Sequence, residues 1–192
     1  MLRAVLVLLG FSWGLWADEC VPTGHAAHPA IVSPDGRYRL LNLLCASAND
    51  KARGALVLAD VHSGTSRTVY TYDRDATALW SPDSQHIAVN DYAGSNLTLN
   101  PVLSVDSKGS SIDLQMQVVP VLNSRRIPTD DHLYMSVTRW LSNDEVELVV
   151  WGHGAGRGFC KAYSVRLSGG VGERELRIVG TDPEGYCGKL AK

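Results

Sequence analysis

From about residue 30 onward, the chain alternates short apolar runs with clusters of turn-forming residues. The runs at 55–58, 67–72 and 146–150 are rich in Val, Leu, Tyr and Thr, and most of these residue types favour strands. Gly, Pro, Asn, Asp and Ser separate the runs, which indicates tight turns. No segment of twelve or more residues keeps the 3.6-residue apolar period of an amphipathic helix. The pattern therefore predicts an all-β, antiparallel domain.

A weak internal repeat divides this region into three units. Each unit contains a turn sequence between two predicted strands: VSPDG at 32–36, WSPDS at 80–84 and WLSND at 140–144. Proline presets φ at the second position of such a turn, and Asp, Asn or Gly tolerates the conformation that follows. Another strand and a second turn come downstream, ending at Gly64, Gly109 and Gly169. Trp80 and Trp140 stand at matching places before the turns, so we expect both in the core between units.

This order of strands and Ser-Pro-Asp-Gly-like turns resembles the blade repeat of WD40-like β-propellers, especially the TolB type, over roughly residues 30–180. The resemblance implies four-stranded antiparallel units whose loops bind other proteins. It carries over no catalytic residue, because the shared motif is turn chemistry. Closed propellers have about 4–8 blades, whereas the spacing here, 48 residues from Ser33 to Ser81 and 60 from Trp80 to Trp140, gives three units.

The expected fold is therefore a propeller-like array of three four-stranded units, open or partial. Two copies could instead complete a six-unit ring through their exposed strand edges. We favour a monomer over that dimer.

The first 17 residues have the pattern of a secretory signal peptide. Arg3 precedes an apolar run that reaches Trp16, and Ala17 supplies a small residue before the cut. The run is shorter than the roughly 20 residues of a membrane-spanning helix, so we expect cleavage and no membrane anchor in the mature form. Residues 18–192 then form a single domain, periplasmic if the source is bacterial and secreted otherwise.

Export changes how the cysteines are interpreted. The chain has four cysteines, Cys20, Cys45, Cys160 and Cys187, and an even number in an exported protein predicts two structural disulfides. No Cys-x-x-Cys pair occurs, so a zinc ribbon is not expected. We favour the pairs Cys20–Cys45 and Cys160–Cys187. The alternative joins Cys20 to Cys187 and Cys45 to Cys160.

If the three units are equivalent, the loops at 45–51, 90–96 and 152–158 lie at one end of the domain. Loops held by a rigid β frame often carry function, so this end is the expected binding surface for another protein. Its candidate residues are Asp91, Tyr92, Asn96, Trp151, His153 and Arg157. The alternative is that these loops are ordinary hairpin connections, with glycines supplying positive φ.

Residues 119–132 account for the longer spacing before the third unit and are expected to form a loop. Arg125 and Arg126 in this loop could bind a carboxylate of a partner. Asp130 and Asp131 could instead neutralise them internally.

Composition and motifs narrow the function. The chain is 45% hydrophobic with a formal net charge of −2, and its basic residues are scattered, which argues against disorder and against nucleic-acid binding. It has no Gly-x-Ser-x-Gly or His-Glu-x-x-His motif, and its six histidines are dispersed, so we expect no enzyme, no metal site and no cofactor.

We predict an exported, non-catalytic protein that binds another protein, such as an envelope protein or a toxin. An inhibitor or immunity protein is one form of this prediction. The alternatives are a hydrolase with an unrecognised site on the loops and a passive structural component of the envelope.

Overall fold

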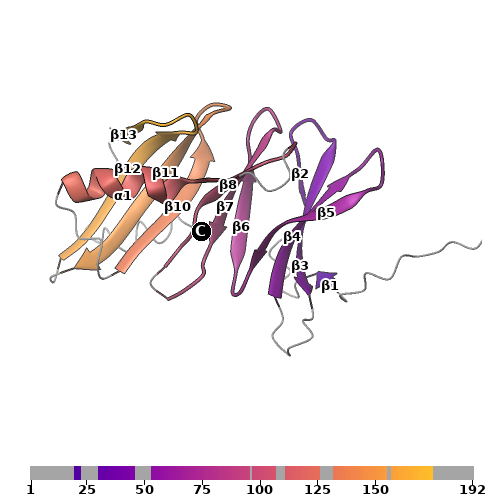
Figure 1. The fold of residues 1–192 in the computed structure, drawn as a ribbon, viewed down its shortest axis with the longest axis horizontal. Coiled ribbons are helices and arrows are strands. Elements are labelled where there is room, and N and C mark those ends of the chain that lie inside the picture. The colour runs from indigo at the N-terminus through magenta and orange to yellow at the C-terminus, as the bar shows by residue number, and fades with distance from the viewer. Residues whose placement is uncertain are drawn as a thin grey trace, which may run out of the picture.

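The computed structural model describes residues 20–22, 30–45, 53–95, 97–106, 111–125, 132–154 and 157–174. Its strands form three antiparallel sheets that lie side by side in chain order (Figure 1). The expected signal peptide, 1–17, lies outside the described residues. We call the sheets blades 1, 2 and 3.

Blade 1 contains β1 (Cys20–Pro22), β2 (Ile31–Val32), β3 (Tyr38–Cys45), β4 (Arg53–Asp60) and β5 (Ser66–Tyr72). Blade 2 contains β6 (Ala76–Trp80), β7 (His86–Asp91), β8 (Pro101–Ser104) and β9 (Ser111–Asp113). Blade 3 contains β10 (His132–Trp140), β11 (Glu145–Gly154), β12 (Arg157–Arg166) and β13 (Val171–Arg174).

Each blade is a meander in which strands consecutive in the chain pair with one another. Blade 1 needs two pieces for its first strand, because β1 pairs with 43–45 of β3 and β2 pairs with 39–40 of the same strand. The predicted array of three four-stranded units is thus confirmed. In the described part of the chain no strand of blade 1 pairs with one of blade 3, so the array is open.

The predicted turns form as expected in blades 1 and 2. The Ser33 hydroxyl donates to the Asp35 carboxylate over 2.6 Å and accepts the Tyr38 N–H. Ser81 makes the same two contacts, with Asp83 at 2.6 Å and with the His86 N–H. The third turn is one residue tighter, because the Leu141 N–H reaches the Glu145 carbonyl whereas the Ser81 N–H reaches the His86 carbonyl.

One residue of the second turn takes an unusual backbone conformation. Gly36 has a φ of 73°, which glycine adopts readily, but the equivalent Ser84 also has a positive φ, 63°. The Ser84 side chain is buried, and its hydroxyl accepts the Asp35 N–H of blade 1 over 3.1 Å. A hydrogen bond between blades therefore accompanies the strained residue.

The two turn tryptophans show that the repeat extends to contacts between blades. The Trp80 indole donates to the Ile31 carbonyl, and the Trp140 indole donates to the Leu79 carbonyl, each over 3.2 Å. The acceptors occupy equivalent positions, because Ile31 lies two residues before Ser33 and Leu79 lies two residues before Ser81. Both tryptophans lie between blades as predicted, but they are half-buried and not fully enclosed.

The core is divided between the two interfaces of the array. Alternation along β7 sends Ile87 and Val89 toward blade 1 and Ala88 toward blade 3. The interface of blades 2 and 3 is completed by one helix, α1 (Leu114–Ser124), whose buried residues are Leu114, Val118 and Leu122.

Helix α1 corrects the expectation that 119–132 is a loop. Asp113 caps the helix by accepting the Gln115 N–H over 2.9 Å, and apolar residues every four positions bury one face. The helix contains Pro120 and has only eleven residues, so its apolar period is too short to stand out in the sequence. Residues 126–131 lie outside the described part.

Candidate protein-binding surface

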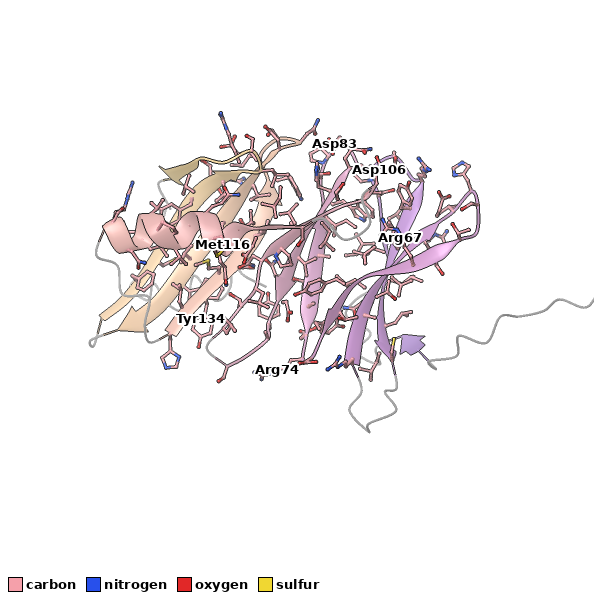
Figure 2. The ribbon with its side chains drawn as sticks, viewed as in Figure 1. Arg67, Arg74, Asp83, Asp106, Met116 and Tyr134 are labelled. Atoms are coloured by element: carbon pink, nitrogen blue, oxygen red, sulfur yellow. The ribbon has the colours of Figure 1, made fainter. Side chains whose placement is uncertain are left out.

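The strand ends that flank the three predicted loops can be located from the strand order. In Figure 2, Arg74 and Tyr134 lie low in the view, at one end of the strands, and Asp83 and Asp106 lie high in it, at the opposite end. Asp83 belongs to a repeat turn between the first two strands of blade 2, so the described end of β7 and the start of β8 lie at the end of Tyr134. We call this end the loop end.

A row of aromatic side chains lies at the loop end of blade 3. Tyr134 of β10 pairs with Trp151 of β11, and their rings stack with centroids 5.6 Å apart and planes at 20°. His132, two residues before Tyr134 on the same strand, also stacks on it, with ring centroids 6.3 Å apart and planes at 10°. All three rings are half-buried, so each keeps some surface available to a partner.

The neighbouring loop of blade 2 joins this row. The Tyr134 hydroxyl donates to the Ser95 carbonyl over 2.6 Å, and Leu97 forms a parallel bridge with Leu133. The Leu97 side chain is 44% exposed. We call Leu97, His132, Tyr134 and Trp151 the aromatic surface.

Buried amides hold β10 rigidly beneath this surface. Asn90 accepts the Val137 N–H over 2.7 Å and donates to the Val137 carbonyl over 3.0 Å. One residue pair along, Thr98 accepts the Met135 N–H over 2.7 Å and Asn100 donates to the Met135 carbonyl over 3.3 Å. Side chains of blade 2 thus satisfy the edge of β10 as a neighbouring strand would.

Several predicted residues lie at this end. Trp151 belongs to the aromatic surface. The backbones of His153 and Arg157 lie in the adjoining hairpin of β11 and β12. The Tyr92 N–H donates to the Asp75 carbonyl and so extends the pairing of β6 with β7. Asn96 and Arg126 lie outside the described residues.

Two residues that were predicted to bind a partner lie elsewhere in the fold. Asp91 is only 4% exposed and accepts the Tyr70 hydroxyl over 2.8 Å, so it lies inside the interface of blades 1 and 2 and not on an open loop. Burial raises the pKa of the Asp91 carboxyl, and the charge of Asp73 adds to the rise, while the Tyr70 hydrogen bond opposes it. Arg125 caps the C-terminus of α1, a helix that contacts β12 and β13.

Gly152 is required for a different reason from the one expected of the glycines at 152–158. Strands β11 and β12 continue to Gly154 and from Arg157, so most of this segment is strand and not loop. A Cβ on Gly152 would lie 1.9 Å from the His132 carbonyl oxygen. Glycine is required there because the backbone of β10 passes so close.

The sequence interpretation missed His132, Tyr134 and Leu97 as parts of one surface. His132 and Tyr134 are two residues apart, which places them on one face of a strand. That alternation was a usable signal. The register that sets Tyr134 opposite Trp151 depends on the strand pairing, so it could not be predicted from the sequence.

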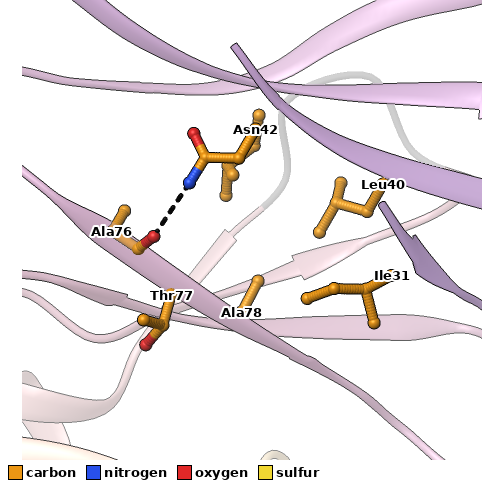
Figure 3. A pocket seen from close by; sticks show the side chains of 7 residues that line it. Ile31, Leu40, Asn42, Ala76, Thr77 and Ala78 are labelled. Atoms are coloured by element: carbon orange, nitrogen blue, oxygen red, sulfur yellow. Dashed lines mark hydrogen bonds between the residues drawn. The ribbon is translucent and has the colours of Figure 1, made fainter. Parts of the chain in front are cut away.

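The described residues also line hollows away from this surface. The larger, of about 510 Å³, is lined by Tyr38, Leu58, Asp60, Thr65, Ser66, Arg67 and Val105. A pocket of about 60 Å³ lies between blades 1 and 2, lined by Ile31, Leu40, Asn42, Leu56, Ala76, Thr77 and Ala78 (Figure 3). Small-molecule sites usually have about 300–1,000 Å³, a range that the larger hollow reaches and the smaller pocket does not. No group of three His, Cys, Asp or Glu side chains in these residues could hold a metal, and none of their helices could cross a membrane.

The fold of the chain is similar to that of a solved β-propeller domain. The β-propeller domain of the Trilobed protease from Pyrococcus furiosus, which has an open velcro topology, matches 76% of this chain and 42% of its own, with a TM-score of 0.52 and 14% identity. The chain is a partial β-propeller of three blades. TolB from Acinetobacter baumannii matches 74% of this chain and 30% of its own (TM-score 0.44, 15% identity). A prolyl endopeptidase matches 72% and 20% (TM-score 0.44, 17% identity).

The likeness concerns the fold alone at these identities. The partial propeller spans less than half of each of these three chains. No family model and no curated protein matches its sequence.

Proposed function

We propose that this partial propeller is exported and binds another protein through the aromatic surface, without catalysis of its own. The observation that carries the proposal is the half-exposed row of His132, Tyr134 and Trp151 beside exposed Leu97. Aromatic residues with polar ends dominate binding energy at protein interfaces, because they bury a large area at little entropic cost. The N-terminal pattern at 1–17 supports export.

Rigid support favours binding over a purely structural role. The amides of Asn90 and Asn100 and the Tyr134–Ser95 hydrogen bond fix the surface before a partner arrives. A preformed surface loses less entropy on association. An envelope protein or a toxin is the partner class that we expect for an exported protein of this kind.

The test compares two exposed apolar residues on different parts of the molecule. Leu97→Asp places a charge on the aromatic surface, and Met116→Asp places one on α1, where Met116 is 74% exposed (Figure 2). The wild-type protein, purified from envelope extract under native conditions, should retain a stoichiometric partner. We expect Leu97→Asp to weaken its affinity at least tenfold and Met116→Asp to leave it unchanged, with both variants melting like the wild type.

Equal retention by both variants would show that the partner binds elsewhere. Turnover of a peptide or ester substrate by the wild type, with no partner retained, would favour the hydrolase alternative instead.

A further inference from the structure

The hollow of about 510 Å³ is a gap between the first two blades. Blade 1 supplies all of its lining residues except Val105, which follows β8 of blade 2. At the interface of blades 2 and 3, α1 fills the space between the sheets. No helix does so here, because only residues 73–75 join β5 to β6. The hollow is therefore built into the way the chain passes from blade 1 to blade 2.

One face of blade 1 forms most of its wall. Tyr38 is the strand partner of Asp60, and Leu58 is the strand partner of Arg67, so these side chains share the face toward blade 2. Tyr38, Leu58 and Val105 belong to the core between the blades and are at most 8% exposed. Because so little apolar surface is open, a ligand in the hollow would be recognised through polar and charged groups.

Arg67 supplies a positive charge that no carboxylate of the described residues neutralises. Its half-buried side chain donates from Nη2 to the Val105 carbonyl across the hollow, and it forms no ion pair with a described Asp or Glu. A guanidinium carries five N–H donors in a planar fork. One bond from Nη2 leaves at least one edge of two parallel donors open, and such an edge fits a carboxylate bidentately.

Asp60 limits the charge that this hollow can accept. Its carboxylate accepts the N–H groups of His62 and Ser63 over 2.8 and 3.0 Å and pairs with Arg37 over 3.3 Å. Arg37 thus balances Asp60, whereas Arg67 keeps its charge. Asp60 and Arg67 are diagonal neighbours on β4 and β5, about 7–8 Å apart between such positions. At that distance Asp60 repels a dianion, such as a phosphate group, more strongly than a monocarboxylate.

We infer that the hollow binds a small monocarboxylic acid that carries a hydroxyl or ammonium group close to its carboxylate. Arg67 holds the carboxylate, and the second group donates to the Asp60 carboxylate or to the Thr65 hydroxyl on the facing part of the wall. The volume lies in the range of small-molecule sites. Arg67 lies away from Tyr134 of the aromatic surface (Figure 2), so this inference is independent of the proposed function.

Four compounds with one three-carbon skeleton test the inference on the full chain labelled with ¹⁵N. Alanine carries the carboxylate and an ammonium, lactate has a hydroxyl in its place, propionate lacks the second group, and alaninamide lacks the carboxylate. We expect alanine and lactate to shift the NMR amide signals of Thr65, Arg67 and Val105 and to leave that of Tyr134 unchanged. The tighter of the two identifies the second group. Propionate should bind at least about threefold more weakly, and alaninamide should not bind.

Several outcomes of these titrations would overturn the inference. They are an absence of shifts at Thr65, Arg67 and Val105 with both alanine and lactate, binding of alaninamide as tight as that of alanine, and binding of propionate as tight as that of both. Tighter binding of inorganic phosphate than of lactate would also overturn it.

A pair of matched variants tests the role of Arg67. Arg67→Gln removes the charge, and Arg39→Gln makes the same change at an exposed residue on the opposite face of the same sheet. We expect Arg67→Gln to weaken binding of the tighter ligand at least about tenfold and Arg39→Gln to leave it unchanged. Arg67→Lys, which keeps the charge without the fork, should weaken it about threefold. Equal affinities for the wild type and both Arg67 variants would overturn the inference. If Arg67→Gln does not fold, Arg67→Lys and the wild-type signals still decide.

Discussion

The two interfaces of the array use the same repeat positions but different chemistry. Between blades 1 and 2, Tyr38 stacks on Trp80 at 6.3 Å, the buried Asp91 carboxylate accepts from Tyr70, and a small pocket remains. Between blades 2 and 3, α1 fills the space with residues that are 0% exposed, and the buried polar groups that join the blades are neutral: the amides of Asn90 and Asn100 and the Thr98 hydroxyl.

This difference shows where stability and pH sensitivity are located. A buried neutral amide costs less than a buried carboxylate, which keeps a larger desolvation penalty. The interface of blades 2 and 3, which supports the aromatic surface, should therefore be the more stable of the two. The interface of blades 1 and 2 should carry the response to pH.

Removal of the Asn90 amide should have the largest effect. Asn90 is 2% exposed, and Asn90→Ala leaves both the N–H and the carbonyl of Val137 without partners in the core. Each buried orphan costs about 1–3 kcal/mol, so we expect a loss of about 3–4 kcal/mol in the free energy of unfolding, measured by urea denaturation.

Asn42→Ala is the matched control in the other interface. Asn42 is half-buried and contacts the Ala76 carbonyl and the Tyr72 hydroxyl, so its removal should cost only about 1–2 kcal/mol. Equal losses for the two variants would contradict the proposed difference between the interfaces.

Truncation of Trp80 should have an intermediate effect. Because its ring is half-buried, Trp80→Ala should lose about 2–3 kcal/mol, less than for a fully enclosed indole. Trp80→Phe keeps a ring against Tyr38 but loses the hydrogen bond to the Ile31 carbonyl, which should cost about 1 kcal/mol. Thermal unfolding of both variants separates stacking from hydrogen bonding. A Phe variant as unstable as the Ala variant would mean that the hydrogen bond dominates.

The features that could be predicted from the sequence are those set by local chemistry. The turns at Ser33 and Ser81 depend on residues within five positions, so the three units could be identified without any long-range information. Helix α1 was not predicted because it is short and contains Pro120, although Asp113 before Leu114 is a typical N-terminal capping residue.

The candidate site was harder to predict because it depends on contacts between blades. Trp151 was identified by its residue type, but its partner Tyr134 follows from the register of β10 with β11, and Ser95 joins from blade 2. Asp91 is a candidate of the loop surface because residues 90–96 follow an apparent strand and are predicted to form a loop. Only the approach of Tyr70 from blade 1 shows that its carboxylate is inside.

The smallest predicted effect concerns the pH dependence of the first interface. Because burial raises the pKa of Asp91, the folded protein holds this proton more tightly than the unfolded chain does, and the stability contributed by this group falls as pH rises from about 4 toward neutrality. Asp91→Asn removes that decline and keeps an acceptor for Tyr70. The stability of the variant relative to wild type should therefore increase between pH 4 and pH 7 in urea denaturation. Asp35→Asn should show the opposite trend, because the Ser33 hydrogen bond lowers the pKa of Asp35 and its contribution is lost as pH falls. If both variants follow the same trend, the buried carboxylate is not what distinguishes the two interfaces.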